Sequence, residues 1–357
     1  MLRAHNLRLL SPYEADAANR NLIADSAKAV AEVLVVAGHL INCDIAKLPV
    51  PYYFSDILNI VHMPLFCLIG GYFSLRLQES PFLQMLKKSM LRILLPYLVW
   101  STVAVAAKAG MTILNGTFSL RESLTLWYTT LLLGKSLWFF LTLFLVRVLA
   151  WAVFRLRAIS GWLAAAVLAL IAIIPFPGET ELYFLLRLHD LLPIFCLGCF
   201  LHNSKKLNAL LIKHLFSGTT LFVCCLLLLT SPFFAALYRI IPDGILRNPL
   251  SIVMEAAMLP GVFLPICMLL HKLPSVERQT ARWGLYTMDV YCIHMVFVEY
   301  LRFQMPESVL SSIQVVSSVC YLFEAILITG ICVLIARLLH SFFSPYHRLM
   351  SGSWKKP

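Results

Sequence analysis

The sequence contains few charged residues. Of its 357 residues, 13% are Asp, Glu, Lys or Arg, whereas 60% are hydrophobic. Soluble domains carry about 25% charged residues, so this chain has too little polar surface to cover a water-soluble particle. The mean hydropathy of +0.81 agrees with that conclusion. The low charge excludes a string of soluble domains and indicates an integral membrane protein.

Acidic residues are scarcer than basic ones, 18 against 29, which leaves a net charge of +11. A nucleic-acid-binding face needs clustered basic residues. Here the basic residues stand in short blocks between apolar runs, as the loop charges of membrane proteins do. We therefore expect membrane lipids and no nucleic acid as partners, and we leave open a homodimer.

A disulfide framework is also missing, although the chain has ten cysteines. Nearly all of them lie inside apolar stretches, where a thiol packs as a small hydrophobic group. Cys196-x-x-Cys199 lies in an apolar run and has no second pair to accompany it. No chemistry is therefore expected from the cysteines.

Apolar runs of about twenty residues recur along the chain and predict an all-α membrane protein with about ten transmembrane helices in one bundle. The predicted spans are 27–46, 57–75, 92–113, 136–154, 159–176, 184–201, 214–231, 250–270, 284–301 and 312–337. The shorter segment 122–134 predicts an interfacial or re-entrant helix, and the later topology inverts if it spans. Basic residues concentrate in alternate loops, which places both termini in the cytosol.

This pattern divides the chain into a cytosolic leader at 1–24, a transmembrane domain at 25–340 and a basic cytosolic tail at 341–357. The leader contains Arg3, Arg8 and Arg20 and lacks the apolar run and small-residue cleavage site of a signal peptide. We expect the protein to reside in the bacterial inner membrane.

Ionisable side chains inside the apolar runs are candidates for function, because burying them in lipid is costly. Asp25 and Lys28 stand three residues apart at the entry of the first run, so they share a helical face and can pair. His39 follows Lys28 after about three turns and about 16 Å, near the bilayer midplane. The adjacent Gly38 would let another helix or a ligand approach His39 closely.

Two further histidines lie in apolar runs. His62 stands in the second run, ahead of Gly70-Gly71, which permits tight packing, and His294 lies near the middle of the ninth, five residues after Asp289. Such histidines can be interhelical hydrogen-bonding residues with no catalytic role. No close His/carboxylate spacing supports a metal site, so we expect no metal.

Five blocks of sequence occur in order between residues 25 and 294. They are Asp25-x-x-Lys28 with Gly38-His39; His62-Met63-Pro64-Leu65-Phe66 with Gly70-Gly71; Arg92 with Leu95-Pro96-Tyr97; Leu137-Trp138-Phe139; and Gly284 to His294 with Thr287 and Tyr291. Together they resemble the acyltransferase-3 family of integral-membrane acyltransferases, and within it the fucose 4-O-acetylase-like subgroup. Two positions differ from the family's usual pattern: Gly70 stands where Ser is usual, and Asp289 replaces an apolar residue.

The resemblance implies transfer of an acyl group, most often acetyl, from acyl-CoA to a hydroxyl of a glycan or glycolipid precursor. Acetyl-CoA would be the donor substrate, with no permanently bound cofactor. His39 would act as general base or transient acyl carrier, because an imidazole with a pKa of about 6.5 can deprotonate a hydroxyl at neutral pH. Lys28 and Arg92 would bind CoA phosphates or stabilise thioester charge, although Lys28 lacks the guanidinium fork.

The remaining residues of the five blocks would support that reaction. His62 and His294 would bind the acceptor or complete a proton relay, and the supporting positions would be Asp25, Trp138, Tyr291 and Asp289. A proton-coupled transporter could use the same histidines and carboxylates. Transporters often have paired helices that Gly or Pro interrupts at matching positions in two halves of the chain. The sequence shows no such pair, which weakens this alternative. A non-catalytic membrane scaffold is a third hypothesis.

Overall fold

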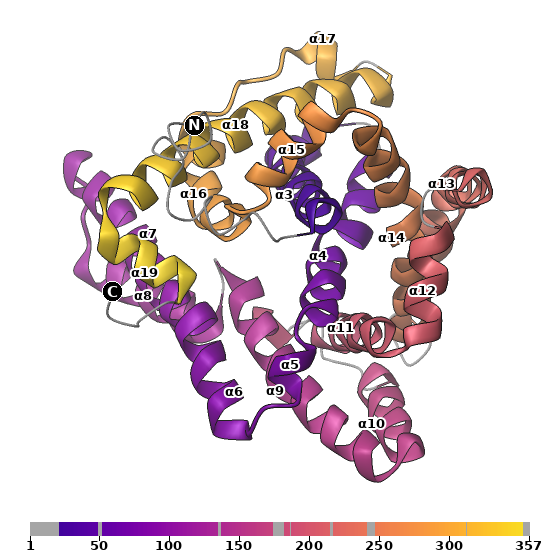
Figure 1. Cartoon of the computed structure of the whole chain (residues 1–357). Coiled ribbons are helices and arrows are strands. Elements are labelled where there is room, and N and C mark those ends of the chain that lie inside the picture. Colours follow the sequence, from indigo (N-terminus) through magenta and orange to yellow (C-terminus); the bar gives the residue numbers. More distant parts are fainter. Residues whose placement is uncertain are drawn as a thin grey trace, which may run out of the picture. The chain divides into compact units, whose positions relative to one another are not determined.

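The structure, a computed structural model, describes residues 21–48, 52–134, 137–173, 182–185, 187–214, 217–240, 247–311 and 313–352. Throughout these ranges the regular structure is helical, without a strand (Figure 1). The predicted all-α class is therefore confirmed for this part of the chain. Residues 1–20 of the predicted leader and 353–357 of the predicted tail lie outside it.

Each of the ten predicted spans corresponds to one helix, although the helix ends differ from the predicted ends. The helices are α3 (Leu22–Asp44), α4 (Tyr53–Tyr72), α7 (Leu95–Leu114), α9 (Trp138–Ile159), α10 (Gly161–Ile173), α11 (Leu188–Asn203), α13 (Gly218–Ile240), α14 (Arg247–His271), α16 (Thr287–Tyr300) and α18 (Gln314–Phe342). The segment predicted as a short helix is α8 (Leu120–Leu133), which ends at Gly134 in the left-handed conformation, with φ 68°. The apolar periodicity thus predicted where helices form.

Six helical segments of the described chain are long and apolar enough to cross a membrane. They are Leu22–Lys47, Tyr53–Tyr72, Phe82–Leu114, Leu120–Ile159, Pro249–His271 and Gln314–Phe342. The fourth includes residues 135–136, which lie outside the described ranges. Gly161–Ile173 and Gly218–Thr230 are apolar but shorter. These helices support an integral membrane protein, whereas the count of about ten spans and the cytosolic termini stay predictions.

Shorter polar helices connect the apolar ones and were not predicted. They are α5 (Leu75–Gln78), α6 (Phe82–Ser89), α12 (Lys205–His214), α15 (Pro274–Trp283), α17 (Glu307–Leu310) and α19 (Ser344–Ser351), with 3-10 turns at Ile45–Lys47 and Tyr183–Leu185. A π-helical segment, Met90–Leu94, joins α6 to α7 and carries Arg92. Their mixed composition hides such helices from a search for long apolar runs.

The chain forms two compact units. The first contains residues 1–69, 204–242 and 253–347, and the second contains residues 70–203, 243–252 and 348–357. In the first, α3 packs against α15, α16 and α18. In the second, α9 packs against α10, α11 and the π-helical segment, while α7 packs against α8. The buried face of α3 includes Ala29, Ala31 and Ala37, small residues that let neighbouring helices approach closely.

Two glycines allow close helix contacts, one in each unit. A Cβ at Gly284, at the end of α15, would lie 1.9 Å from the carbonyl oxygen of Asp25. A Cβ at Gly71 would lie 2.0 Å from the carbonyl oxygen of Phe195. The predicted tight packing is therefore confirmed at Gly71. At Gly70 the nearest atom would be 3.5 Å away, on the Phe195 ring, which is an ordinary contact.

Asp44 joins the ends of three elements in the first unit. Its carboxylate accepts a hydrogen bond from Arg302 Nη1 at 3.0 Å and from the Tyr321 hydroxyl at 3.2 Å. The hydrogen bond to Asp44 raises the pKa of Arg302, so the guanidinium stays charged throughout the accessible pH range. This buried carboxylate connects the end of α3 to α18 and to the segment after α16, and it sits little more than one turn beyond His39.

Candidate active site

The entry of α3 holds the predicted Asp25–Lys28 pair. The Asn21 side chain caps the helix by accepting a hydrogen bond from the Ala24 backbone N–H at 3.0 Å. Lys28 Nζ lies 2.5 Å from Asp25 Oδ1, with side chains 18% and 5% exposed, respectively. The close contact of Gly284 with the Asp25 backbone sets the position of this turn. The predicted pairing is confirmed, and it leaves Lys28 partly accessible.

His39 and His294 lie together, although they are far apart in the sequence. Their ring centroids are 5.1 Å apart, with an interplanar angle of 41°. The packing of α3 against α16 produces this approach. His294 is buried, whereas His39 remains partly exposed. The centroid of the Tyr291 ring lies 5.9 Å from that of His294, so the predicted supporting tyrosine packs beside His294.

The hydrogen bonding of His294 defines its tautomer. Its Nδ1 lies 2.9 Å from the carbonyl oxygen of Val290. Because a carbonyl only accepts, Nδ1 carries the hydrogen, and in the neutral ring Nε2 then has a lone pair. That Nε2 is buried and has no hydrogen-bond partner among the residues that the structure describes. His294 can therefore receive a proton or a hydrogen bond at Nε2.

Open space lies next to His39. Gly38 is buried, yet a Cβ placed there would meet no described atom within 4 Å. The close approach of another helix, which the sequence allows at Gly38, does not occur within the described ranges. The free volume beside the partly exposed imidazole is instead available to a ligand.

His62 is held within its own helix. Its Nδ1 contacts the carbonyl oxygen of Leu58, one turn earlier in α4, and its side chain is partly exposed. This contact directs one ring nitrogen toward the backbone. The proposed part of His62 in acceptor binding stays a prediction.

Asp289 belongs to a buried polar cluster that sequence reasoning missed. Its Oδ1 accepts hydrogen bonds from the Tyr346 hydroxyl at 2.5 Å and from His340 Nε2 at 3.0 Å. His340 Nδ1 lies 3.1 Å from His347 Nδ1. The predicted span ended at residue 337, so the sequence placed His340 at the end of the predicted transmembrane domain, and Tyr346 and His347 in the predicted basic tail. The only indication in the sequence was the close spacing of these three residues over the end of α18 and the start of α19.

The predicted residues Arg92 and Trp138 lie in the second unit. Arg92 is exposed on the π-helical segment, and Trp138 opens α9 with its ring edge-on to Phe139, centroids 5.9 Å apart. The Tyr97 hydroxyl of the Leu-Pro-Tyr block donates to the carbonyl oxygens of Thr130 at 2.6 Å and Leu131 at 2.9 Å. This block therefore joins α7 to α8. A donor site shared by Lys28 and Arg92 stays a prediction.

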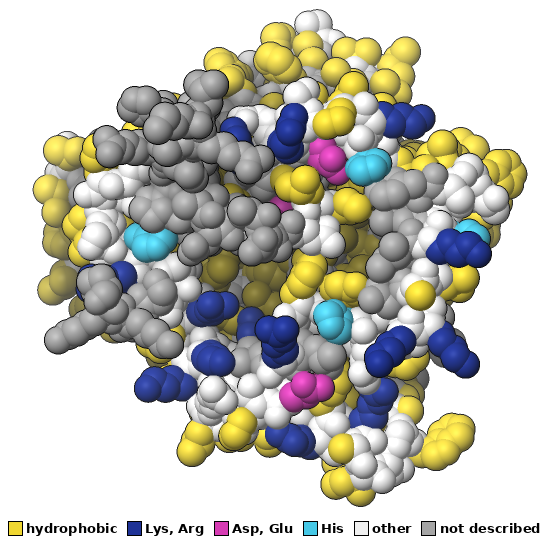
Figure 2. All heavy atoms as spheres, in the orientation of Figure 1, with side chains coloured by type: hydrophobic (Ala, Val, Ile, Leu, Met, Phe, Trp, Pro, Cys, Tyr) yellow, Lys and Arg dark blue, Asp and Glu magenta, His cyan; other side chains and the backbone are white. Residues whose placement is uncertain are grey.

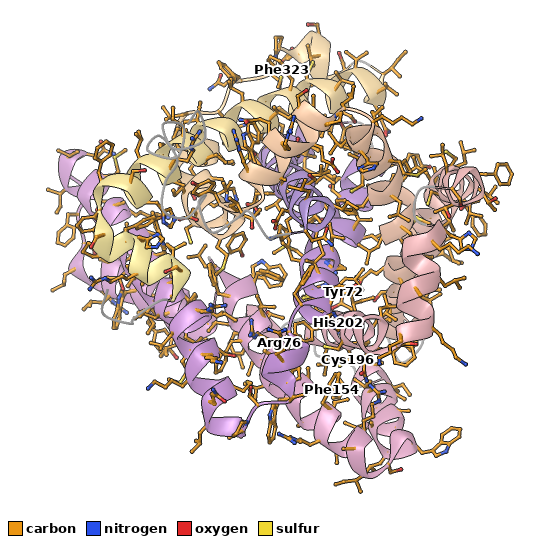
Figure 3. The ribbon with its side chains drawn as sticks, viewed as in Figure 1. Tyr72, Arg76, Phe154, Cys196, His202 and Phe323 are labelled. Carbon is orange, nitrogen blue, oxygen red and sulfur yellow. The ribbon has the colours of Figure 1, made fainter. Side chains whose placement is uncertain are left out.

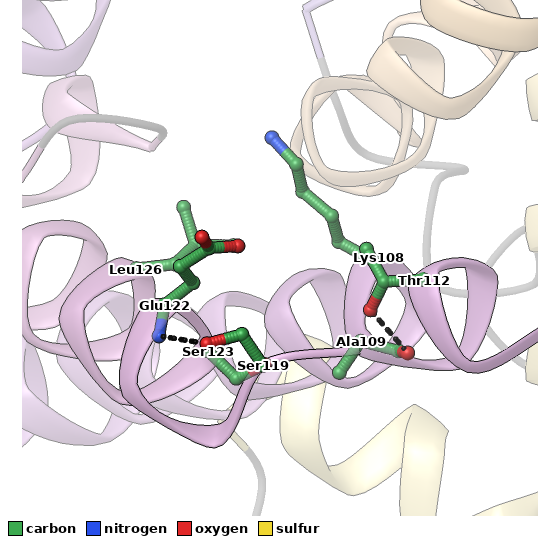
Figure 4. Close-up of a pocket in the computed structure, with 7 residues that line it drawn as sticks. All are labelled: Lys108, Ala109, Thr112, Ser119, Glu122, Ser123 and Leu126. Carbon is green, nitrogen blue, oxygen red and sulfur yellow. Dashed lines mark hydrogen bonds between the residues drawn. The ribbon is translucent and has the colours of Figure 1, made fainter. Parts of the chain in front are cut away.

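An open cavity of about 230 Å³ lies between α7 and α8 in the second unit (Figure 4). Its lining consists of Lys108, Ala109, Thr112, Ser119, Glu122, Ser123 and Leu126. Lys108 and Glu122 are both exposed and extend into the space from opposite helices. No predicted site residue lines it, and solvated side chains of this kind do not make a buried reaction site. We therefore place the candidate site at His39 and His294.

Metal ligation finds no support in the described ranges, because no three His, Cys, Asp or Glu side chains there are grouped to hold an ion. The expectation of a metal-free site stays a prediction.

Comparison with known proteins assigns the family. A profile described as an acyltransferase domain matches residues 21–337, nearly the whole length of the chain. The chain belongs to the acyltransferase-3 family. The five blocks that carry the resemblance lie within the matched residues, and two of their histidines are the ones that meet between α3 and α16.

The acyltransferase-3 chain is also similar to two curated relatives, both called nodulation protein NolL. The relative from Sinorhizobium fredii is 30% identical over 195 residues, covering 52% of this chain and 49% of the relative. The relative from Mesorhizobium japonicum is 30% identical over 189 residues, covering 50% and 47%, respectively. The chain thus spans about half the length of these relatives. No solved structure gives a significant match.

Proposed function

We propose that the protein is a membrane O-acetyltransferase that moves an acetyl group from acetyl-CoA to a hydroxyl of a cell-surface glycan or glycolipid precursor. The observation that carries the proposal is the imidazole pair of His39 and His294, packed together within an acyltransferase domain. The bacterial inner membrane is the proposed location, since acyl-CoA is cytosolic and the basic loops favour cytosolic termini.

His39 is the proposed general base. A ring nitrogen takes the proton of the acceptor hydroxyl while the oxygen forms a bond to the thioester carbonyl carbon. The carbon–sulfur bond then breaks, and the leaving thiolate regains a proton from the imidazolium. His39 suits this role because it is partly exposed and has open space beside it at Gly38.

His294 is the proposed partner of that base. Its Nε2 lone pair can accept a hydrogen bond or a proton, whereas its Nδ1–H is engaged by Val290. A neutral neighbour of this kind stabilises the positive charge that develops on His39 without competing for the hydroxyl proton. Tyr291 packs against His294 and restricts the orientation of its ring.

Lys28 is the proposed ligand of a CoA phosphate. It precedes His39 by about three helical turns, or about 16 Å, which is too far for contact with a thioester at His39. The pantetheine arm of CoA separates phosphate from thioester by a comparable length. Asp25 anchors the ammonium at 2.5 Å, so the phosphate role is favoured over stabilisation of thioester charge.

Purified protein with labelled acetyl-CoA and lipid-extracted glycans tests the proposal. We expect label transfer to the glycan fraction, and none with His39→Ala. Lys28→Ala should raise the apparent KM for acetyl-CoA more than that for the acceptor, with Lys47→Ala as the exposed control. Turnover by His39→Ala would reject the assigned base, and an unchanged donor KM would reject the role of Lys28.

Proton-coupled transport is the second candidate. The hydrogen-bonded series Asp289–His340–His347 could conduct protons. Solute flux driven by a pH gradient, together with no label transfer, would favour the transporter. A scaffold would instead leave the cellular phenotype intact in His39→Ala.

A further inference from the structure

The second unit contains buried polar atoms without partners. Gln78 is 1% exposed, and neither its amide oxygen nor its amide nitrogen is hydrogen-bonded to any residue that the structure describes. Arg147 Nε and His202 Nδ1 are likewise buried, without a partner in the described part of the chain. Such atoms are uncommon because each costs the energy of its lost hydration. Several such atoms in one unit indicate side chains that form hydrogen bonds to a ligand when it is bound.

These groups surround one stretch of α9. Arg147 lies in the interior of that helix. The π-helical segment with Arg92 packs against α9, and so does α5 with Gln78. Arg92 and Arg147 are close enough to repel each other electrostatically. No carboxylate among the described residues forms an ion pair with either guanidinium, so two positive charges here lack a counter-charge.

Contacts within the polypeptide fix the positions of α5 and of the end of α4. The Ser74 hydroxyl donates to the Gly71 carbonyl oxygen at 3.0 Å, and the Gln78 backbone N–H donates to that of Ser74 at 3.0 Å. The Tyr72 ring stands edge-on to His202, centroids 4.8 Å apart, where α4 meets α11 (Figure 3). These contacts fix α5 and Gln78 relative to the end of α4 before any ligand binds, and α5 packs against α9.

The Arg92 side chain is positioned by a glycine. A Cβ at Gly352 would come within 2.4 Å of Arg92 Cγ, and Gly352 has a φ of +64°. Lys and Arg side chains gather around α5 and α6 on the face shown in Figure 2. Arg76, Lys87 and Lys88 are exposed there in addition to Arg92. An anion approaching this part of the second unit therefore meets a positive field.

We propose that Arg147, Arg92 and Gln78 bind a phosphate group of a substrate. A phosphate offers several acceptor oxygens and at least one negative charge, which satisfies two guanidinium groups and the amide N–H of Gln78 together. A group that enters the interior of an apolar helix bundle must be attached to a longer molecule. The inference rests on the proposed acyl transfer, in which acyl-CoA or a lipid-linked acceptor carries such a phosphate.

Binding of unacylated CoA to the full-length protein in phosphatidylcholine nanodiscs tests the site without requiring turnover. Arg147→Gln should raise the Kd about 10- to 100-fold, as for loss of a hydrogen bond to a charged group. Arg147→Lys should recover part of the affinity, because the charge returns without the fork. Arg157→Gln, an exposed arginine over the rings of Phe154 and Phe200, is the matched control.

A second variant separates binding from folding. Gln78→Leu removes an unsatisfied buried amide, so the Tm should rise while CoA affinity falls about fivefold. If Gln78 had only a structural role, its replacement would not raise the Tm and lower the CoA affinity at the same time. A parallel experiment in nanodiscs that contain phosphatidic acid tests whether the phosphate belongs to a lipid-linked substrate. If this lipid raises the Tm of the wild type and does not raise that of Arg147→Gln, the phosphate is assigned to a lipid-borne substrate.

If Arg147→Gln binds CoA and responds to phosphatidic acid as the wild type does, the site is wrong even where acetyl transfer is intact. If Arg147→Gln loses phosphate binding while no acetyl transfer is found, the site stands and the proposed reaction fails. An equal loss of CoA affinity in the control variant Arg157→Gln overturns the assignment to Arg147.

Discussion

At the scale of single residues, His294 uses one ring nitrogen for the Val290 carbonyl and keeps the other available. That arrangement makes it a passive partner and leaves proton transfer to His39, the more exposed ring of the two. Asp25 and Lys28 form a separate pair about three turns earlier. Base and phosphate ligand thus occupy one helix at a spacing suited to a long donor.

The two histidines should act as one unit. Removing His39 as general base should lower kcat by about 10²- to 10⁴-fold, and His294→Gln should lower it less, because the base itself remains. The double variant should be no slower than His39→Ala, since effects of residues that act together do not add. Steady-state kinetics of the three variants measures this coupling. Fully multiplicative losses would show that the rings act independently.

The space beside His39 predicts a size limit at Gly38. Gly38→Ala should retain activity, because a Cβ meets no described atom within 4 Å. Gly38→Leu should lower turnover at least about tenfold by filling the volume needed for the reacting groups. Thermal unfolding of both variants should resemble that of the wild type. Normal turnover in Gly38→Leu would mean that substrate approaches His39 from another side.

At the scale of helices, α15 positions the start of α3. Its last turn brings Gly284 against the Asp25 backbone, where no Cβ fits, and Asp25 in turn holds Lys28. A polar helix between two spans thus determines where a proposed phosphate ligand stands. The similar contact of Gly71 with Phe195 joins α4 to α11 in the second unit.

Gly284→Ala should separate α15 from α3. The added Cβ would lie 1.9 Å from a backbone oxygen, and overpacking of this kind costs about 1–3 kcal/mol. We expect a lower Tm and a raised KM for acetyl-CoA, with the acceptor KM little changed. Gly110→Ala in α7 is the control, since nothing lies within 4 Å of a Cβ there. Equal Tm values for the two variants would contradict this packing.

At the scale of the whole molecule, the distribution of charge predicts the topology. Basic residues concentrate in alternate loops, and both termini are expected in the cytosol. Six segments of the described chain have the length and hydropathy of a span. Whether α8, α10 and the other shorter helices cross the membrane depends on their neighbours as well as on their composition.

Tags at residue 357 and in the 302–311 loop test this topology. If both termini are cytosolic and ten helices span, the two tags should report opposite sides of the membrane. Cysteine labelling with a membrane-impermeant reagent in intact cells measures it, with the native cysteines replaced. Labels on the same side would indicate that the last predicted span, 312–337, does not cross the membrane. Labels on opposite sides with residue 357 outside would indicate that α8 spans or that one of the first nine predicted spans does not.

Much of the fold could be predicted, because apolar runs in a low-charge chain must form helices that satisfy their own backbone. Each predicted span corresponds to a helix, and Asp25 and Lys28 pair as their spacing of three residues allows. The polar helices α15 and α19 could not be found from hydropathy, and with them the partners of Asp289 were missed. Local spacing carries no information on which distant helices meet.

The sequence by itself determined the membrane class, the family and the candidate residues, since these depend on composition and on local order along the chain. Only the tertiary structure decided that His39 meets His294, that Gly38 faces open space and that Arg147 Nε and the Gln78 amide find no hydrogen-bond partner among the described residues. Helix packing sets these relations through the small residues and close backbone contacts of helices distant in sequence. The chemistry proposed for the protein depends on those contacts.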